Sequence, residues 1–260
     1  MIEFEKVTKK YSGKTAIDSI SFHIKSGTAC GYIGPNGAGK TTTAKIIVGL
    51  ENQNSGEVRV STESDEAKLN DRPSLSNFRL RSTKPVIGYV PESPKLYESM
   101  TPIETIALAA LLRKFDKKEA IKKLEAISEI FSFGEYLKKP VQSISKGIKQ
   151  KVVISLALIF NPKILVLDEP TDGLDVQAVV TLKKLLKSFT SHGGTVFYSS
   201  HLLDVVESVC DKVLFIDKGK IVREYLGIEF KSNRGYLENV FMEQVGAKNQ
   251  LVDTFFENKL

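Results

Sequence analysis

A glycine-rich stretch near the N-terminus has the residue types and spacing needed to hold phosphate groups. Residues 34–42 read GPNGAGKTT and match the pattern GxxxxGK[ST] at every fixed position. The glycines let the backbone wrap closely, so that successive N–H groups face the phosphates. Lys40 is expected to reach the β- and γ-phosphates, and the Thr41 hydroxyl is placed to bind Mg²⁺. The predicted nucleotide contacts are Gly34, Asn36, Gly37, Ala38, Gly39, Lys40, Thr41 and Thr42.

Two adjacent acids form the second group of residues that could do chemistry. Asp168 and Glu169 follow the apolar run 164–167, which predicts a buried strand. Asp168 suits the Mg²⁺ shell, usually through water, and Glu169 suits an attacking water as general base or orienter. The alternative is a strand that ends in two solvated acids, and the phosphate loop elsewhere in the chain makes the catalytic interpretation the stronger one.

The elements that must position these residues alternate between strand and helix. Strand-like runs occur at 2–7, 16–24, 29–33, 57–60, 86–90, 164–167 and 195–200. Helical patterns occur at 42–50, 148–159, 176–190 and 202–210, and 213–216 with 221–224 predicts a hairpin. This order indicates a largely parallel sheet covered by helices on both faces.

Two segments interrupt the alternation. Residues 101–139 predict a helical insertion, in which Ile121, Leu124, Ile127, Ile130 and Phe131 fall at helical spacing. Residues 61–84 are polar and aperiodic, which predicts a long loop or partly disordered insertion. Ser145 is the expected N-cap of the helix that follows the insertion.

Composition limits the class of protein. The chain has 260 residues, of which 42% are hydrophobic and 26% charged, as in a soluble globular domain. No apolar run approaches the roughly 18–20 residues of a transmembrane helix, and the polar N-terminus lacks the features of a signal peptide. Another chain would therefore have to supply any membrane span.

Cys30 and Cys210 are far apart and are expected to be small buried residues. The net charge of +6 is spread along the chain, which favours a solvated surface over a nucleic-acid-binding patch.

Five further motifs follow the order found in ATP-binding cassette (ABC) ATPases. Tyr11 lies where that family places an aromatic against adenine, and Glu92 lies at the Q-loop position after the residues GYVP. The residues SKGI at 145–148 resemble the signature sequence, and DGLD at 172–175 resembles the D-loop. His201 resembles the switch histidine at a strand end. Seven motifs in order over residues 2–224 make the resemblance specific.

The resemblance implies a fold and a domain organisation. The fold is an α/β P-loop NTPase core with a RecA-like, mainly parallel sheet, an antiparallel β sub-domain and an inserted α-helical sub-domain. The ATPase domain is expected at residues 1–225, with the helical sub-domain at about 93–150. Residues 226–260 are a C-terminal extension of unassigned role.

The resemblance also implies a mechanism for the motif residues. Two subunits dimerise head-to-tail around ATP, and Ser145, Lys146 and Gly147 of each contact the nucleotide of the other. Asp175 communicates across the dimer. The expected catalytic residues are Glu169 and His201. The expected Mg²⁺ ligands are Thr41, Glu92 and Asp168.

The implied partners are a separate transmembrane permease and a second copy of the chain or a paralogous ATPase subunit, with no nucleic acid. The protein would then be cytoplasmic and peripheral on the inner face of the cell membrane. Three departures from the usual motifs are Lys146 for the first signature glycine, Ile148 for a glutamine and Glu92 for the Q-loop glutamine. This combination resembles bacterial exporters of drugs, peptides and bacteriocins.

Several alternatives stay open at this stage. Tyr11 could be a surface aromatic, His201 a strand-end residue, and Asp175 a helix N-cap that also serves the dimer. Rival functions are a soluble ABC-type ATPase that acts on nucleic acid, and an ATP-binding module with poor turnover. A GTPase or small-molecule kinase is disfavoured because the sequence has no NKxD-like tetrapeptide and carries the signature-like motif.

Overall fold

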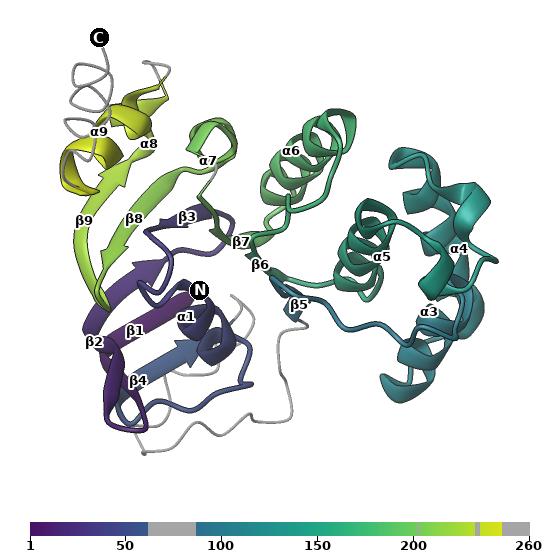
Figure 1. Ribbon diagram of the computed structural model, residues 1–260, viewed down its shortest axis with the longest axis horizontal. Helices are drawn as coiled ribbons and strands as arrows, with labels where there is room; N and C mark the ends of the chain where they lie inside the picture. Colours follow the sequence, from purple (N-terminus) through teal and green to yellow (C-terminus); the bar gives the residue numbers. More distant parts are fainter. Residues whose placement is uncertain (62–86, 202, 232–234, 246–260) are drawn as a thin grey trace, which may run out of the picture.

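A computed structural model describes residues 1–61, 87–201, 203–231 and 235–245. The stretch predicted as a loop or disordered insertion lies almost wholly outside the described residues. In the described part, two sheets and their helices form one lobe, and a second lobe contains α3 and α4 at the opposite end of the molecule (Figure 1).

The first sheet is a three-stranded antiparallel one. Its strands are β1 (Ile2–Tyr11), β2 (Lys14–Ile24) and β4 (Ser55–Val60), in the order β2-β1-β4. Both β1 and β2 are longer than their apolar runs predict, because the polar residues at the hairpin end continue the pairing up to Tyr11 opposite Lys14. This sheet corresponds to the expected antiparallel sub-domain.

The second sheet has the order β5-β6-β7-β3-β8-β9. Its strands are β3 (Ala29–Ile33), β5 (Ile87–Val90), β6 (Ile164–Asp168), β7 (Thr195–Ser199), β8 (Lys212–Asp217) and β9 (Lys220–Leu226). All neighbours are parallel except β8 and β9, which form the predicted hairpin. The carboxyl ends of β5, β6, β7 and β3 therefore meet along one edge of the sheet.

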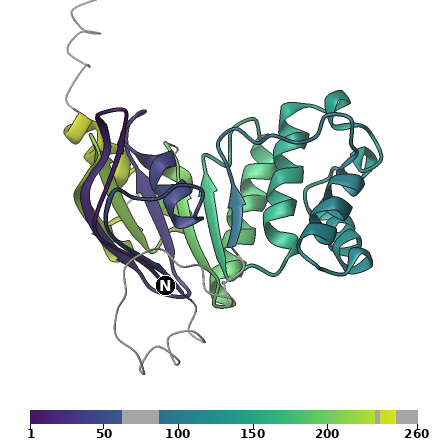
Figure 2. The same ribbon diagram turned by 90° about the horizontal axis from the view of Figure 1, so that it is seen from below.

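Both faces of this sheet are buried, as predicted for a parallel sheet. One face packs against α1 (Lys40–Ile47) and the antiparallel sheet, with Tyr32 and Phe197 in the shared core. The other face packs against α5 (Lys146–Ile159), α6 (Val176–Ser191) and α7 (Leu203–Val209). Figure 2 shows the sheet between these layers. Cys30 and Cys210 are buried free cysteines, as predicted.

The helical lobe contains α3 (Pro102–Leu112) and α4 (Lys117–Ile130), followed by short 3₁₀ turns η1 (Gly134–Tyr136) and η2 (Val141–Ser143). Thr101 and Glu104 form a capping box at the start of α3, and Asp116 caps α4. The predicted helical spacing is present in α4: Leu124 and Phe131 are buried, whereas Ile130, the last residue of the helix, is 56% exposed. Among the described residues, no helix is long and apolar enough to cross a bilayer.

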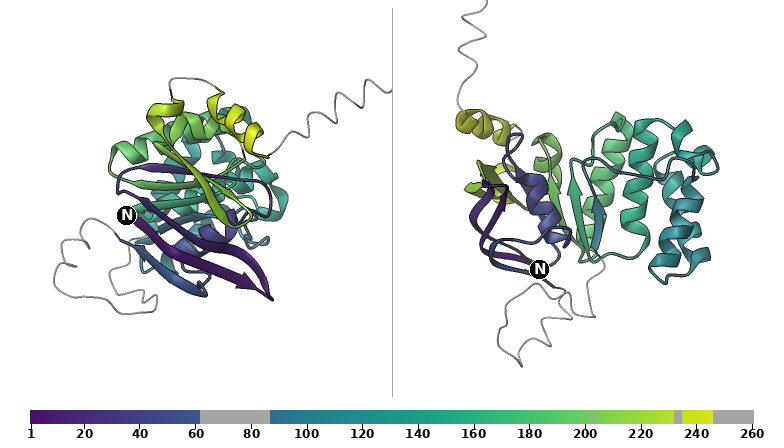
Figure 3. Two further views of the ribbon diagram at one scale, coloured as in Figure 1. Left: turned by 90° about the vertical axis from the view of Figure 1, so that its left-hand side faces the viewer. Right: turned by 60° about the horizontal axis from the view of Figure 1, so that its bottom comes forward.

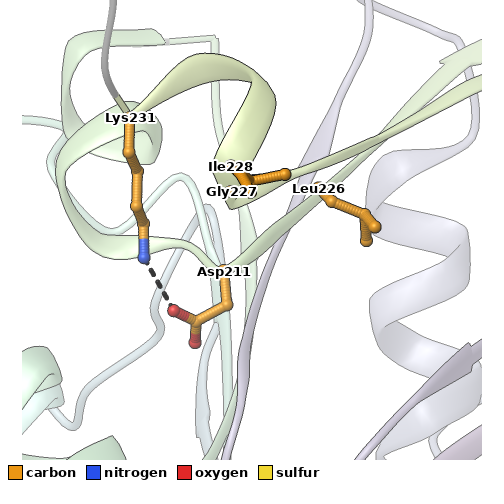
Figure 4. Close-up of a pocket in the computed structure, with 5 residues that line it drawn as sticks. All are labelled: Asp211, Leu226, Gly227, Ile228 and Lys231. Atoms are coloured by element: carbon orange, nitrogen blue, oxygen red, sulfur yellow. Dashed lines mark hydrogen bonds and ion pairs between the residues drawn. The ribbon is translucent and has the colours of Figure 1, made fainter.

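The chain after β9 packs onto the main lobe through α8 (Gly227–Phe230) and α9 (Tyr236–Val245) (Figure 3). Phe230 and Leu237 are buried in the core. The Lys231 amine pairs with Asp211 at 2.7 Å (Figure 4). The other Asp211 oxygen accepts a hydrogen bond from the Ala29 N–H. This contact ties the segment to the start of β3, the strand that leads into the phosphate loop. The surface depression drawn in Figure 4 contains none of the predicted site residues.

Candidate nucleotide-binding site

The phosphate loop connects β3 to α1 and is held by its own lysine. Helix α1 begins at Lys40, two residues earlier than the periodicity predicted. The Lys40 side chain is buried, and its amine donates hydrogen bonds to the carbonyl oxygens of Gly34, at 2.7 Å, and Pro35, at 3.4 Å. Asn36 and Gly37 are exposed at the tip of the loop. Helix α1 thus starts where the loop ends. The partial positive charge at its N-terminus favours an anion bound in the loop.

Asp168 is the most buried acid of the site. It ends β6, is fully inaccessible to solvent, and accepts a short hydrogen bond from the Ser199 hydroxyl at the end of β7. Its Oδ2 is buried and has no hydrogen-bond partner among the described residues. Burial raises the pKa of Asp168, while the nearby hydroxyls of Ser199 and Thr41 oppose that rise. Thr41 also donates to the Glu92 carboxylate at 3.3 Å, so three oxygen-bearing side chains converge here.

Glu169 lies beside this group and contacts two basic side chains. Its Oε1 is 3.7 Å from the Lys40 amine, and its Oε2 is 2.9 Å from Nδ1 of His201. Glu169 is 8% exposed and adopts a left-handed backbone conformation with φ of 48°, while its N–H donates to the Ser199 carbonyl. A non-glycine residue rarely adopts this conformation, and such strain concentrates at functional sites.

The comparisons with known proteins agree with this geometry. The family model described as ABC transporter matches residues 17–172, which is more than half of the chain. The chain belongs to this family. It is an ATP-binding protein with the ATPase activity of the ABC cassettes.

The similarity to relatives and to solved structures covers most of this ABC chain. The lantibiotic transport ATP-binding protein SrtF of Streptococcus pyogenes is 33% identical over 247 residues, which are 94% of this chain and 97% of SrtF. A solved ATP binding subunit of an ABC transporter has a TM-score of 0.78 and 25% identity, and the match covers 95% of this chain and all of that one. The dimeric post-hydrolysis state of the cassette MJ0796, bound to ADP and Pi, has a TM-score of 0.70 and 25% identity, covering 87% and 99% of the two chains. The expected fold class is confirmed.

The signature-like residues of this ABC ATPase form a second group, at the start of α5. Ser145 caps α5 by accepting a hydrogen bond from the Ile148 N–H, as predicted. The Lys146 amine pairs with Asp172 at 2.6 Å. A Cβ added to Gly147 would lie 2.5 Å from the Gly173 carbonyl oxygen, so glycine is required for this close approach.

Asp175 is the N-cap of α6, and it also forms an ion pair with the buried Lys151. It accepts a hydrogen bond from the Ala178 N–H at the start of α6, and its other oxygen is 2.9 Å from the Lys151 amine. Both interactions lower the pKa of Asp175, the backbone hydrogen bond more strongly. The predicted capping role is therefore present, and it does not compete with a role in a dimer.

Tyr11 stands apart from both groups in the single subunit. It is 39% exposed at the end of β1, and the Lys9 amine lies 4.8 Å from the centre of its ring. No described contact joins it to the phosphate loop, so its role against adenine stays a prediction.

The structure adds residues that sequence reasoning missed. These are Ser199, Gln150 and Lys151. The sequence predicts Asp172 only as part of the D-loop-like motif and does not predict its ion pair with Lys146. The buried Gln150 amide donates to the carbonyl of Pro170, directly after Glu169. Ser199 could have been found, because it ends the strand that precedes His201. The others become visible only once α5 is packed against residues 170–175.

Proposed function

We propose that this ABC ATPase is the ATP-driven motor of a transporter, works as a head-to-tail dimer, and acts through a separate membrane-spanning partner, in the direction of export. The observation that carries the proposal is the convergence of Lys40, Thr41, Glu92, Asp168, Glu169 and His201 at the carboxyl ends of four neighbouring parallel strands. Ligand sites of open α/β sheets form at this edge.

In the proposed reaction, a water oxygen attacks the γ-phosphorus of ATP, and the bond to the β–γ bridging oxygen breaks. Glu169 accepts the proton of the water, and ADP leaves with the electron pair of the broken bond. Lys40 neutralises charge on the β- and γ-phosphates. The Lys40 amine lies 3.7 Å from Glu169, so a bound phosphate would share this lysine with the catalytic carboxylate. His201 orients the Glu169 carboxylate through its 2.9 Å contact.

The residues beside Glu169 fit a magnesium ion. Thr41, Glu92 and Asp168 would supply the hard oxygen ligands that Mg²⁺ prefers, and the Asp168 Oδ2 is a buried acceptor with no hydrogen-bond partner in the part of the chain that the structure describes. When bound, Mg²⁺ neutralises charge that develops on the phosphates. Asp168 must be ionised for this role. Burial raises its pKa, and the Ser199 hydrogen bond opposes that rise.

The second group of site residues supports the dimer. Ser145 and Lys146 are exposed at the N-terminus of a 14-residue helix, which favours an anion. Their described contacts run to Ile148 and Asp172 rather than to the phosphate loop of the same chain. A loop from a second copy or a paralogous subunit could then face this helix, as the dimeric assembly of MJ0796 suggests.

The export direction is supported by the similarity to SrtF, which is named for lantibiotic transport. We place the protein on the cytoplasmic face of the membrane, held there by its permease. Nucleic acid is not part of this proposal.

Co-purification tests the proposal most directly. The tagged chain would be isolated from gently solubilised membranes of its native cell, with an untagged strain as control. A stoichiometric polytopic membrane protein is the expected companion. Recovery with ribosomes or nucleic acid, and with no membrane protein, would overturn the transport role while leaving the ATPase activity intact.

A further inference from the structure

The lysine in the signature-like motif has a partner within its own subunit. The Lys146 amine lies 2.6 Å from Asp172 Oδ2, and both side chains are largely exposed, at 70% and 50%. The contact joins the first residue of α5 to the turn that follows Glu169. A lysine at this place in a phosphate-facing motif would otherwise present a free cation to the nucleotide.

The surrounding backbone holds the Lys146 stem in this orientation. A Cβ added to Gly173 would lie only 3.0–3.4 Å from Cγ, Cδ and Cε of Lys146, so the stem crosses directly over this glycine. Gly173 has a φ of 79°, which favours glycine. The Gly147 backbone also approaches Gly173 closely, at its carbonyl oxygen. The amine is therefore directed toward Asp172 by packing as well as by charge.

Two neighbouring contacts differ from this one in exposure. Lys151, with a side chain 7% exposed, pairs with Asp175, and the buried Gln150 binds the Pro170 carbonyl. These contacts attach α5 firmly to residues 170–175. The Lys146–Asp172 pair is the exposed member of the set, and exposed pairs are weak enough to exchange partners.

We propose that Asp172 is a competitor for the Lys146 amine, which exchanges this carboxylate for the terminal phosphate of ATP held by the opposing subunit. The inference rests on the proposed head-to-tail dimer. Asp172 is then a positioning residue that raises the ATP concentration needed for dimerisation. ADP lacks the γ-phosphate and therefore offers no anion at the position that the Lys146 amine would have to reach, so only ATP is expected to displace Asp172.

The test measures ATP-induced dimerisation by analytical ultracentrifugation in a Glu169→Gln background, where hydrolysis does not consume the ligand. Asp172→Asn frees the amine and is expected to lower the ATP concentration for half-maximal dimerisation by about 2- to 5-fold. Lys146→Met keeps the stem over Gly173 and removes the charge. When Lys146→Met is already present, Asp172→Asn is expected to cause no further change in the ATP concentration for half-maximal dimerisation. Glu135→Gln breaks another exposed pair, with Lys139, and is the matched control that should change nothing.

The outcomes distinguish a failure of the competition between Asp172 and phosphate from a failure of the proposed dimer. An unchanged ATP midpoint in Asp172→Asn overturns the competition. So does an equal decrease in the Lys146→Met background, because the acid would then act on the phosphates directly. If the Glu169→Gln parent does not dimerise with ATP at all, the proposed dimer fails, and the competition fails with it.

Discussion

Glu169 and His201 are in direct contact, with 2.9 Å between Oε2 and Nδ1, although 32 positions separate them in the sequence. The contact exists because β6 and β7 are parallel neighbours, so the residues that follow them lie at the same edge of the sheet. The other Glu169 oxygen lies 3.7 Å from the Lys40 amine. One carboxylate therefore connects the phosphate loop to the histidine.

Replacing Glu169 by glutamine tests its role as proton acceptor. The amide has almost the same shape but cannot take a proton from water, so kcat is expected to fall by about 10²- to 10⁴-fold. ATP binding should persist, since Lys40 and the loop remain. Phosphate release and nucleotide affinity would be measured on the same samples, with Glu119→Gln on α4 as a control. Equal kcat values for wild type and Glu169→Gln would refute the assignment.

Replacing Lys40 by alanine tests the phosphate loop. The loss of a charged donor is expected to weaken ATP binding by about 10- to 100-fold, by isothermal titration calorimetry. The substitution also leaves the Gly34 and Pro35 carbonyls without this donor, so thermal unfolding should be followed in parallel. Lys45→Ala, on the same helix but in its last turn, is the matched control. An affinity within twofold of wild type would contradict the predicted phosphate contact.

The fold and the two strongest motifs could be predicted because they depend on local chemistry. The phosphate loop needs only a strand, a glycine-rich turn and a helix in succession, and the strand before Asp168 is marked by its own apolar residues. Ser199, by contrast, gains its role from strand register, which pairs it with Asp168. Lys151 and Asp172 gain theirs from the packing of α5 against a turn more than 20 residues away. Helical spacing grouped Ile130 with Leu124, yet Ile130 is exposed and Leu124 is buried, because spacing alone does not tell where a neighbouring element stops covering a helix.

Asp175→Asn is expected to reveal a pH-dependent contribution to stability. Asparagine still caps α6 but no longer pairs with the buried Lys151. Because the Asp175 side chain is 60% exposed and its charge is screened by solvent, the free energy of unfolding at pH 7 should fall by only about 0.5–1 kcal/mol. Folding lowers the pKa of Asp175 below its ordinary value of about 3.9. Its stabilisation is then fully present above that value and is lost as the pH falls through the folded-state pKa.

The measurement is urea unfolding of both proteins between pH 7 and pH 2.5. The difference between wild type and Asp175→Asn should be constant near neutrality and shrink below about pH 4. Asp116→Asn removes the charge of another N-cap, on α4, where no lysine pair is described, and should cost less. A difference that stays constant down to the lowest pH would exclude a contribution from the ionised Asp175.

Gly147→Ala tests whether the close approach of α5 to the turn at 172–175 is needed for activity. The new Cβ would lie 2.5 Å from the Gly173 carbonyl oxygen, which is backbone and cannot rotate away, so α5 or the turn must shift. Overpacking of this kind costs about 1–3 kcal/mol in the free energy of unfolding. Because Asp172 donates its N–H to the Glu169 carbonyl, the shift is transmitted to the catalytic acid, and ATP hydrolysis should fall more than ATP binding.

Gly134→Ala is the control, since its Cβ would meet nothing closer than 3.6 Å. Wild-type hydrolysis in Gly147→Ala would mean that the activity does not depend on this contact.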